Sequence, residues 1–454
     1  MSPTRLAPVA APRPVPGVAH TPPPRVPTVG DRTLANGLRV IAVRRPGVPR
    51  FEIRLRVPLV RGSVADAGRT RLLPEALLSG TAERSSLEIA RRLEELGADL
   101  NAASDVETLY VNGSALTSTA GDFFDLLADV VLAPEFPTAE VAIERERVAH
   151  ELTITQSQPA AVASAAAARR LYGSHPYGRG FTPPDAVRKI GRAGLVRAHA
   201  DRVRPAGATL VVVGDLRPER AAAEAERVFG AWSPGAPVTG APAPPPFSTG
   251  PVLLVDRPGA VQTNIRMVGP AVSRRDPWYA ALSAALTAFG GYFSSRLTIN
   301  IRERRGFTYS PGARMDHWQS SSHLFVAADV ATEVTAPALA EIDYELARMA
   351  ASPLDEEELV AVQRYLVGNL LTAVQTQAGL ATYLAVLVGQ GLGITYLRDQ
   401  PRLIERVTLA SAHEAGARFL GPPRLATILV GDAARILDRV SSLADVVVES
   451  LPGV

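Results

Sequence analysis

The chain contains no cysteine, which excludes disulfide bridges, thiolate zinc sites, iron–sulfur clusters and a cysteine nucleophile. Lysine occurs only at Lys189, so nearly all positive charge is carried by arginine. The 48 basic residues barely exceed the 45 acidic ones and form no long basic run, which argues against a nucleic-acid partner. No apolar run reaches the roughly 18 residues that a spanning helix needs, so we predict no membrane span.

The composition is otherwise that of a folded chain. Its 454 residues are 46% hydrophobic and 20% charged, which excludes wholesale disorder. At roughly 150 residues per domain, this length allows two to four domains. Residues 1–31 differ, because they are rich in proline and contain no apolar stretch typical of a secretory signal. We predict a flexible N-terminal segment there and, with no signal peptide apparent, a cytoplasmic location.

A proline-rich segment divides the rest of the chain. Residues 232–251 contain seven prolines, and such a segment can continue neither a helix nor a central strand. It is predicted to link domains at 32–231 and 252–454. Near its end, each half has an apolar strand followed by Gly-Asp, at 214–215 and 431–432. The predicted fold class is α+β, with two homologous domains, each a mostly antiparallel β-sheet with helices packed on one face.

Hydrophobic periodicity predicts the local elements that carry the motifs discussed below. Helices are expected at 69–78, 86–96, 119–132, 139–156, 187–203, 278–289, 296–304, 335–350 and 355–375. Strands are expected at 51–60, 99–104, 108–115, 209–213, 252–256, 263–268, 324–330 and 427–430. Gly97 suits the C-terminal cap of its helix, and Gly290-Gly291 is predicted to be a helix-breaking loop.

Seven short motifs, in order along the chain from Arg32 onward, resemble those of one peptidase family. They are Leu34-Ala-Asn-Gly-Leu-Arg-Val-Ile, Gly62-Ser63, Gly80-Thr81, His175-Pro-Tyr-Gly-Arg, Val211-Val-Val-Gly-Asp, Gly290-Gly-Tyr-Phe-Ser-Ser-Arg-Leu and Ile301-Arg-Glu-Arg-Arg-Gly-Phe-Thr-Tyr. The chain resembles the M16 family, which is pitrilysin-like or mitochondrial-processing-peptidase-like, in its short bacterial M16B form. The resemblance implies the fold expected above and a link to zinc-dependent proteolysis.

The chain departs from this family at the metal-binding helix. Active members carry H-x-x-E-H, in which two histidines bind zinc and the glutamate activates water. The matching positions here hold Arg71, Pro74 and Glu75. Arginine cannot ligate a cation, and proline has no carboxylate. Glu151 matches the third ligand position, although a solvated or ion-paired glutamate on a charged helix is the alternative interpretation.

No histidine pair elsewhere replaces this motif. The seven histidines are His20, His150, His175, His199, His317, His323 and His413, and no two lie three to five residues apart on one helix with a carboxylate between them. We therefore predict no metal and no cofactor in this chain. His175 lies in a Pro-Tyr-Gly turn for which we expect a structural rather than a catalytic role.

The second half retains residues that the resemblance links to substrate binding. In two-subunit bacterial members, one subunit holds zinc and the other supplies an arginine and a tyrosine, which match Arg302 and Tyr309 here. Both side chains can donate hydrogen bonds to peptide carbonyls or to a developing oxyanion. The alternative is a surface arginine and a core tyrosine. Gly290 and Gly291 resemble a glycine loop that borders the substrate chamber, or form a plain turn between helices.

The resulting hypothesis is a non-catalytic, substrate-binding subunit of a heterodimeric M16B zinc metallopeptidase. Its partner would be an M16-like subunit with H-x-x-E-H and zinc, and its ligand an unfolded peptide added as a strand to a sheet edge. Two alternatives remain open at this point. One is a catalytically inactive structural scaffold, and the other is a metallopeptidase with a non-standard metal site at Glu75 and Glu151.

Overall fold

The computed structural model describes residues 28–59, 64–235 and 241–450. Most of the N-terminal segment predicted to be flexible therefore lies outside the described residues. So do the Gly62-Ser63 motif and residues 236–240 of the proline-rich linker.

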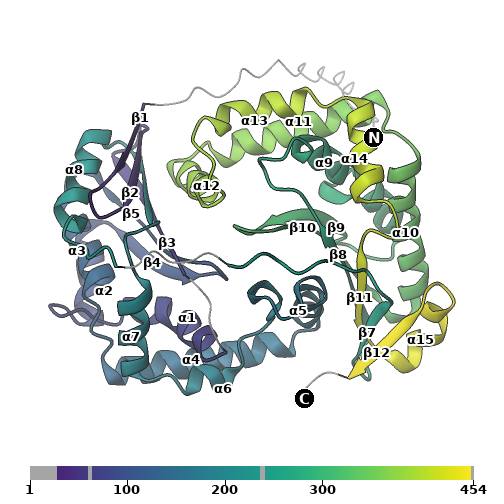
Figure 1. Ribbon diagram of the computed structural model, residues 1–454, viewed down its shortest axis with the longest axis horizontal. Helices are drawn as coiled ribbons and strands as arrows, with labels where there is room; N and C mark the ends of the chain where they lie inside the picture. The colour runs from purple at the N-terminus through teal and green to yellow at the C-terminus, as the bar shows by residue number, and fades with distance from the viewer. Residues whose placement is uncertain (1–27, 60–63, 236–240, 451–454) are drawn as a thin grey trace, which may run out of the picture.

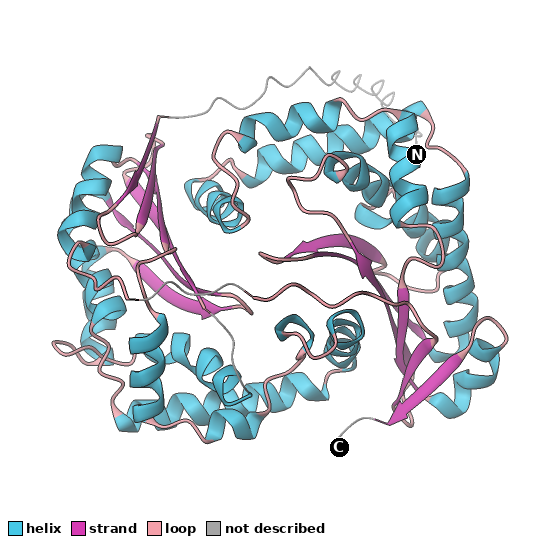
Figure 2. Cartoon of the chain, in the orientation of Figure 1, coloured by secondary structure: helices cyan, strands magenta, loops and turns pink. Residues whose placement is uncertain are grey.

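Two six-stranded sheets form the framework of the molecule (Figure 2). The first has the order β1-β2-β6-β3-β5-β4 and consists of β1 (Val29–Thr33), β2 (Arg39–Arg44), β3 (Arg50–Pro58), β4 (Asp99–Ser104), β5 (Thr108–Leu116) and β6 (Thr209–Gly214). The second has the order β12-β7-β11-β8-β10-β9 and consists of β7 (Val252–Asp256), β8 (Gln262–Pro270), β9 (Gly312–His317), β10 (Ser322–Ala331), β11 (Ala426–Gly431) and β12 (Val446–Ser450). Only β2–β6, β7–β11 and β7–β12 pair in parallel among these strands. The predicted α+β class with mostly antiparallel sheets is confirmed.

Both halves contain many helices, and most of them cover the outer side of the sheets (Figure 1). Those of the first half are α1 (Val64–Leu77), α2 (Ser86–Leu96), α3 (Ala120–Leu132), α4 (Thr138–Ser157), α5 (Pro159–Tyr172), α6 (Pro184–Arg188), α7 (Arg192–Arg202) and α8 (Pro218–Phe229). Those of the second half are α9 (Tyr279–Leu286), α10 (Thr335–Ala351), α11 (Glu356–Ala373), α12 (Gln377–Gly389), α13 (Tyr396–Glu405), α14 (Leu409–Phe419) and α15 (Ala433–Ser441). Two π-helical segments, η3 (Thr287–Gly291) and η4 (Thr298–Arg304), follow α9.

The inner face of each sheet is covered by a helix from the other half. α5 packs on β8 and β11, so that Ala163 and Ala167 share a hydrophobic cluster with Ile428. α12 packs on β3 and β6, so that Leu384 shares a cluster with Val211. This exchange explains why β6 and β11 are continuous apolar runs rather than alternating ones, because both of their faces are buried. The sequence predicted the helices on one face of each sheet, but not this exchange.

Several predicted elements differ in detail. The helix expected at 187–203 is two helices, α6 and α7, separated at 189–191. The helix expected at 296–304 is the π-helical segment η4. The predicted helix-breaking loop at Gly290-Gly291 is wrong in its position, because both glycines end the π-helical segment η3 and a short turn follows at 292–295. A Cβ atom on Gly290 would lie 2.9 Å from the Ala313 Cβ, so close packing against β9 requires glycine there.

α1 contains Pro74 in its interior, where proline normally breaks a helix. Proline has no amide hydrogen to donate to the carbonyl of Thr70, four residues earlier. The Ser104 hydroxyl of β4 donates a hydrogen bond to that carbonyl instead, at 3.1 Å. Ser104, on the edge strand β4, thus supplies a donor to the Thr70 carbonyl that Pro74 leaves without one. This contact reduces the destabilisation caused by proline at this position.

Within the described ranges, no single helix is long and apolar enough to cross a membrane. The pair α11 and α12 meets that length and composition only when taken together, and the two helices are bent by 111°.

We predict that Ser104→Ala lowers the free energy of unfolding by about 1 kcal/mol, because the Thr70 carbonyl loses its donor. The loss should shrink to a few tenths of that in a Pro74→Ala background, where the new amide can donate to Thr70. Urea unfolding of the four proteins of this double-mutant cycle measures both values. Equal losses in the two backgrounds would show that Ser104 does not compensate for Pro74.

Candidate functional site

Charged side chains from α1 and α4 meet at the positions that match the family's metal site. Arg71 donates from Nη1 to Glu75 Oε1 at 2.5 Å and from Nη2 to Glu151 Oε2 at 3.3 Å. Arg147 Nη2 lies 2.6 Å from both Glu75 Oε2 and Glu144 Oε2, and Arg147 also bonds Glu151. We call these five residues the arginine–glutamate cluster. The structure thus brings together Arg71, Glu75 and Glu151.

The cluster nearly balances its own charge, with two guanidinium groups against three carboxylates. Hydrogen bonds from Arg147, first to Glu144 and then to Glu75, hold the pKa of Arg147 above its ordinary value. The Arg71, Glu75 and Arg147 side chains are between 23% and 42% exposed, so water screens these pairs and each contributes modestly to stability. Pro74 is buried and adds no polar group. Glu151 is therefore ion-paired, as the alternative interpretation of the sequence held.

The residues present do not fit a zinc ion. Zinc is held by imidazole, thiolate or carboxylate groups with free lone pairs. The two carboxylates that could serve, Glu75 and Glu151, accept hydrogen bonds from Arg71, whose fixed positive charge would repel a metal cation. No group of three or more histidine, aspartate or glutamate side chains suited to a metal occurs in the part of the chain that the structure describes.

The four residues predicted to bind substrate line a single pocket in the second half. Gly290, Gly291, Arg302 and Tyr309 surround a cavity of about 500 Å³ between η3, η4 and the start of β9. The Arg302 guanidinium lies 4.7 Å from the centre of the Phe293 ring, and its Nε lies 3.2 Å from Glu303 Oε1. We call this the Arg302 pocket.

Tyr309 is a surface residue, with 87% of it exposed. The alternative in which Tyr309 is a core aromatic is therefore wrong. Its hydroxyl has no hydrogen-bond partner among the described residues, so it is available to a ligand. Phe293 is 62% exposed in the same pocket. The sequence did not single out Phe293, although it lies in the Gly-Gly-Tyr-Phe motif, because sequence alone does not show which aromatic side chains remain exposed.

The Arg302 pocket adjoins a free sheet edge. β9 is the last strand of the second sheet, and its described pairing is with β10 alone. Gly312 and Ala313, at the start of β9, line the pocket, as does Arg314. Arg314 stacks over the Phe325 ring at 4.0 Å. An unpaired edge strand beside exposed aromatic and cationic side chains can accept an extended peptide backbone.

The His175-Pro-Tyr turn joins the two halves of the chain. The Tyr177 hydroxyl bonds Glu107 in the β4–β5 turn and lies 2.6 Å from Ser320 Oγ in the β9–β10 turn. The backbone N–H of Gln319 donates a hydrogen bond to Glu107 Oε2 at 2.8 Å. Burial raises the pKa of Tyr177, which keeps its hydroxyl protonated as a donor. Glu107 could not be singled out from the sequence, because its partners Tyr177 and Gln319 lie far away along the chain.

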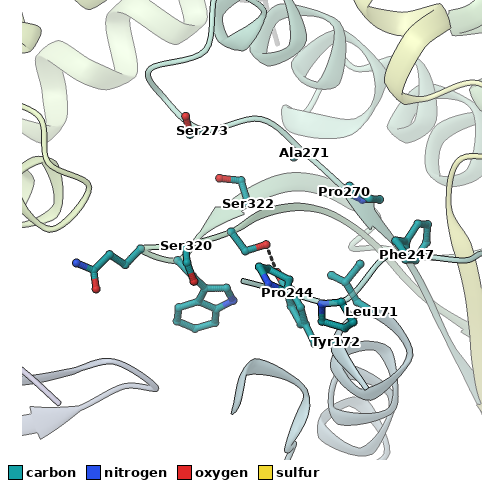
Figure 3. Close-up of a pocket in the computed structure, with 13 residues that line it drawn as sticks. Leu171, Tyr172, Pro244, Phe247, Pro270, Ala271, Ser273, Ser320 and Ser322 are labelled. Atoms are coloured by element: carbon teal, nitrogen blue, oxygen red, sulfur yellow. Dashed lines mark hydrogen bonds between the residues drawn. The ribbon is translucent and has the colours of Figure 1, made fainter. Parts of the chain in front are cut away.

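His175 itself contacts the linker, with Nε2 2.9 Å from the Pro242 carbonyl oxygen. Beside it, a cavity of about 400 Å³ lies between the linker prolines and the β9–β10 turn (Figure 3). The Tyr172 hydroxyl points toward that turn and lies 3.2 Å from Ser321 Oγ and 3.0 Å from His323 Nδ1. These contacts position the linker and carry no catalytic arrangement, in keeping with the structural role expected for His175.

Comparison with known protein families identifies two matching models. The model described as insulinase, peptidase family M16, matches residues 60–185. The model described as peptidase M16 inactive domain matches residues 189–366.

Curated relatives match over most of the chain. An uncharacterized zinc protease of Mycobacterium leprae is 28% identical over 416 residues, which cover 86% of this chain and 91% of the relative. An uncharacterized zinc protease of Mycobacterium tuberculosis is 28% identical over 414 residues, which cover 88% of this chain and 92% of the relative. The uncharacterized zinc protease YmxG of Bacillus subtilis is 21% identical over 349 residues, which cover 76% of this chain and 84% of the relative.

Solved structures share the fold. A peptidase M16 inactive domain from Pseudomonas fluorescens superposes with a TM-score of 0.82 at 24% identity, covering 89% of this chain and 98% of that one. A protease from Helicobacter pylori gives a TM-score of 0.80 at 17% identity, covering 90% of this chain and 100% of that one. Because the two family models match consecutive segments that together span more than half of its length, and its relatives match most of it, the chain belongs to peptidase family M16.

Proposed function

We propose that this chain is the non-catalytic, substrate-binding subunit of a heterodimeric M16B zinc metallopeptidase that cleaves peptides. The observation that carries the proposal is the place of Arg71, whose guanidinium bridges Glu75 and Glu151 where the family holds its metal. Zinc and the H-x-x-E-H helix would belong to a partner M16-like subunit. A cytoplasmic location is part of the proposal.

The Arg302 pocket would supply the binding function. Arg302 and Tyr309 offer N–H and O–H donors, which can hold the carbonyl oxygens of an extended peptide beside the partner's active site. Exposed Phe293 offers an apolar contact to the same peptide. The edge of β9 would read the peptide backbone rather than its side chains, which suits an unfolded substrate of varied sequence.

The two other interpretations fit the geometry less well. A pure scaffold gives no reason for Tyr309 and Phe293 to remain exposed around a cavity beside a free strand edge. A non-standard metal site at Glu75 and Glu151 conflicts with the guanidinium of Arg71 between them.

We predict that the purified chain contains no stoichiometric zinc, whereas the triple variant Arg71→His, Pro74→Glu, Glu75→His binds about one zinc ion per chain. The variant replaces the Arg71 guanidinium and the Glu75 carboxylate with imidazoles that lie on one face of α1, opposite Glu151 on α4. Inductively coupled plasma mass spectrometry after dialysis measures the metal.

Arg71→Ala is the matched control, because it removes the guanidinium without adding a ligand and should remain free of zinc. One zinc ion per wild-type chain, unchanged by Arg71→Ala but lost in Glu75→Gln, would reject the proposal in favour of the non-standard metal site.

We predict that Arg302→Ala and Tyr309→Phe each lower peptide cleavage by the assembled heterodimer by about 10²–10³-fold, as expected when a positioned donor is lost. The complex is to be isolated from native cells with a tag on this chain, and kcat/KM measured with a quenched fluorescent peptide. Neither variant should change how much partner is recovered.

Arg304→Ala and Tyr344→Phe serve as controls, since both residues are exposed and lie outside the Arg302 pocket. They should leave cleavage unchanged. If the two pocket variants cleave at the wild-type rate, Arg302 and Tyr309 have no role in substrate binding.

A further inference from the structure

A second cavity, unrelated to the sites above, lies in the second half of the chain. It has a volume of about 810 Å³ and is bounded by α10, the end of α14 and the start of β12. Its walls are mainly apolar, with Leu339 and Leu346 from α10, Leu420 after α14, and Leu443 and Val447 on the far side. This size is within the range of roughly 300–1,000 Å³ typical of small-molecule sites. We call it the Asp343 pocket.

Asp343 places a carboxylate in this apolar wall. It lies four residues after Leu339 and three before Leu346, so the three side chains share one face of α10. Leu339 and Leu346 are each 2% exposed. Asp343 lines the same pocket but is itself an exposed residue, and partial desolvation raises its pKa to about 6.

The charge of Asp343 is not compensated within the protein. The carboxylate has no hydrogen bond or ion pair to any described residue. No arginine, lysine or histidine lines the pocket among the described residues, and the one other ionisable side chain there is Asp445. The pocket therefore combines apolar walls with negative charge alone, and the complementary ligand is an apolar molecule with a cationic group.

The first half of the chain carries different residues at the corresponding positions. When the 3₁₀ turns before α3 and α10 (Thr117–Thr119 and Thr332–Val334) are aligned, Leu339 corresponds to Phe124 and Asp343 to Ala128. Trp232, which follows α8, is buried, and its Nε1 lies 3.3 Å from the Val203 carbonyl at the end of α7.

The second half has no tryptophan after α15, the helix that corresponds to α8; Leu443 follows it and lines the pocket. The two halves thus differ along α3 and α10, with an aspartate in the second half where the first has an alanine, and in the residues that follow the corresponding helices α8 and α15.

We propose that the Asp343 pocket binds an amphipathic primary amine, whose ammonium group pairs with Asp343 and whose hydrocarbon chain contacts Leu339, Leu346 and Leu420. This inference rests on the geometry of α10 and its neighbours, and it stands or falls independently of the proposed peptidase role.

The test uses n-octylamine as the probe and the full-length chain at pH 8, where Asp343 is ionised and the amine remains protonated. Isothermal titration calorimetry should show one molecule bound per chain. 1-Octanol, which has the same hydrocarbon chain without the charge, should bind at least about 10-fold more weakly, a difference of about 1.4 kcal/mol.

Asp343→Asn keeps the shape of the side chain and should also lower octylamine affinity at least about 10-fold, to the level of octanol. Asp438→Asn is the matched control, because Asp438 is exposed on α15 and does not line the pocket. Leu339→Phe, which restores the residue of the first half, should weaken both ligands by narrowing the cavity.

Binding should also weaken at pH 5, because protonation below a pKa of about 6 removes the charge of Asp343. If protonation of Asp343 causes this loss of affinity, the Asp445→Asn variant should still bind octylamine more weakly at pH 5 than at pH 8. Equal affinity for octanol and octylamine, or unchanged octylamine binding to Asp343→Asn, would overturn the proposal. No binding of octylamine to the wild-type chain would overturn it as well.

Discussion

The reciprocal exchange of α5 and α12 is the constraint on which the rest of the structure depends. Each sheet buries one face against its own helices, and its central strands would otherwise present a second apolar face to water. A helix from the opposite half covers that face in both cases. Neither half can therefore bury its hydrophobic surface alone, and the two are expected to unfold together. The exchange also places the proline-rich linker and the His175 turn between the halves, where Tyr177 bonds both sheet turns.

The arginine–glutamate cluster shows how carboxylates from two helices can be held close together. α1 and α4 remain packed together, and carboxylates from both helices still converge. Without a cation between them, these like charges would repel one another. Arg71 and Arg147 supply positive charge and geometrically fixed donors between these carboxylates, so the helices keep their arrangement. Pro74 is compatible with this arrangement because Ser104 supplies the donor that α1 lacks. The same ion pairs thus occupy the carboxylates and hold α1 against α4.

Elements with local causes were predictable from the sequence, and those with long-range causes were not. α2 begins and ends as predicted at Ser86 and Leu96, because a Ser85–Glu88 capping box starts it and Gly97 caps it in a left-handed conformation. The convergence of Arg71, Glu75 and Glu151 followed from the family resemblance. The exchanged helices did not follow, because an amphipathic or alanine-rich pattern shows that a face is buried but not which sheet buries it. The same limit applies to Gly290, whose role depends on its distance from Ala313, and to the exposure of Tyr309.

The two halves share one fold but differ in what lies beside their edge strands. β4 and β9 are the corresponding last strands of the two sheets, and α1 with its arginine–glutamate cluster packs beside β4, whereas the Arg302 pocket adjoins β9. The turns that join these edge strands to their neighbours meet at Glu107 and Gln319. This hydrogen-bonded corner, together with the exchanged helices, therefore holds α1 and the Arg302 pocket in a fixed relation. Any strand added to the edge of β9 would run between that corner and the Arg302 pocket, because the turn follows the end of β9 and the pocket lies at its start.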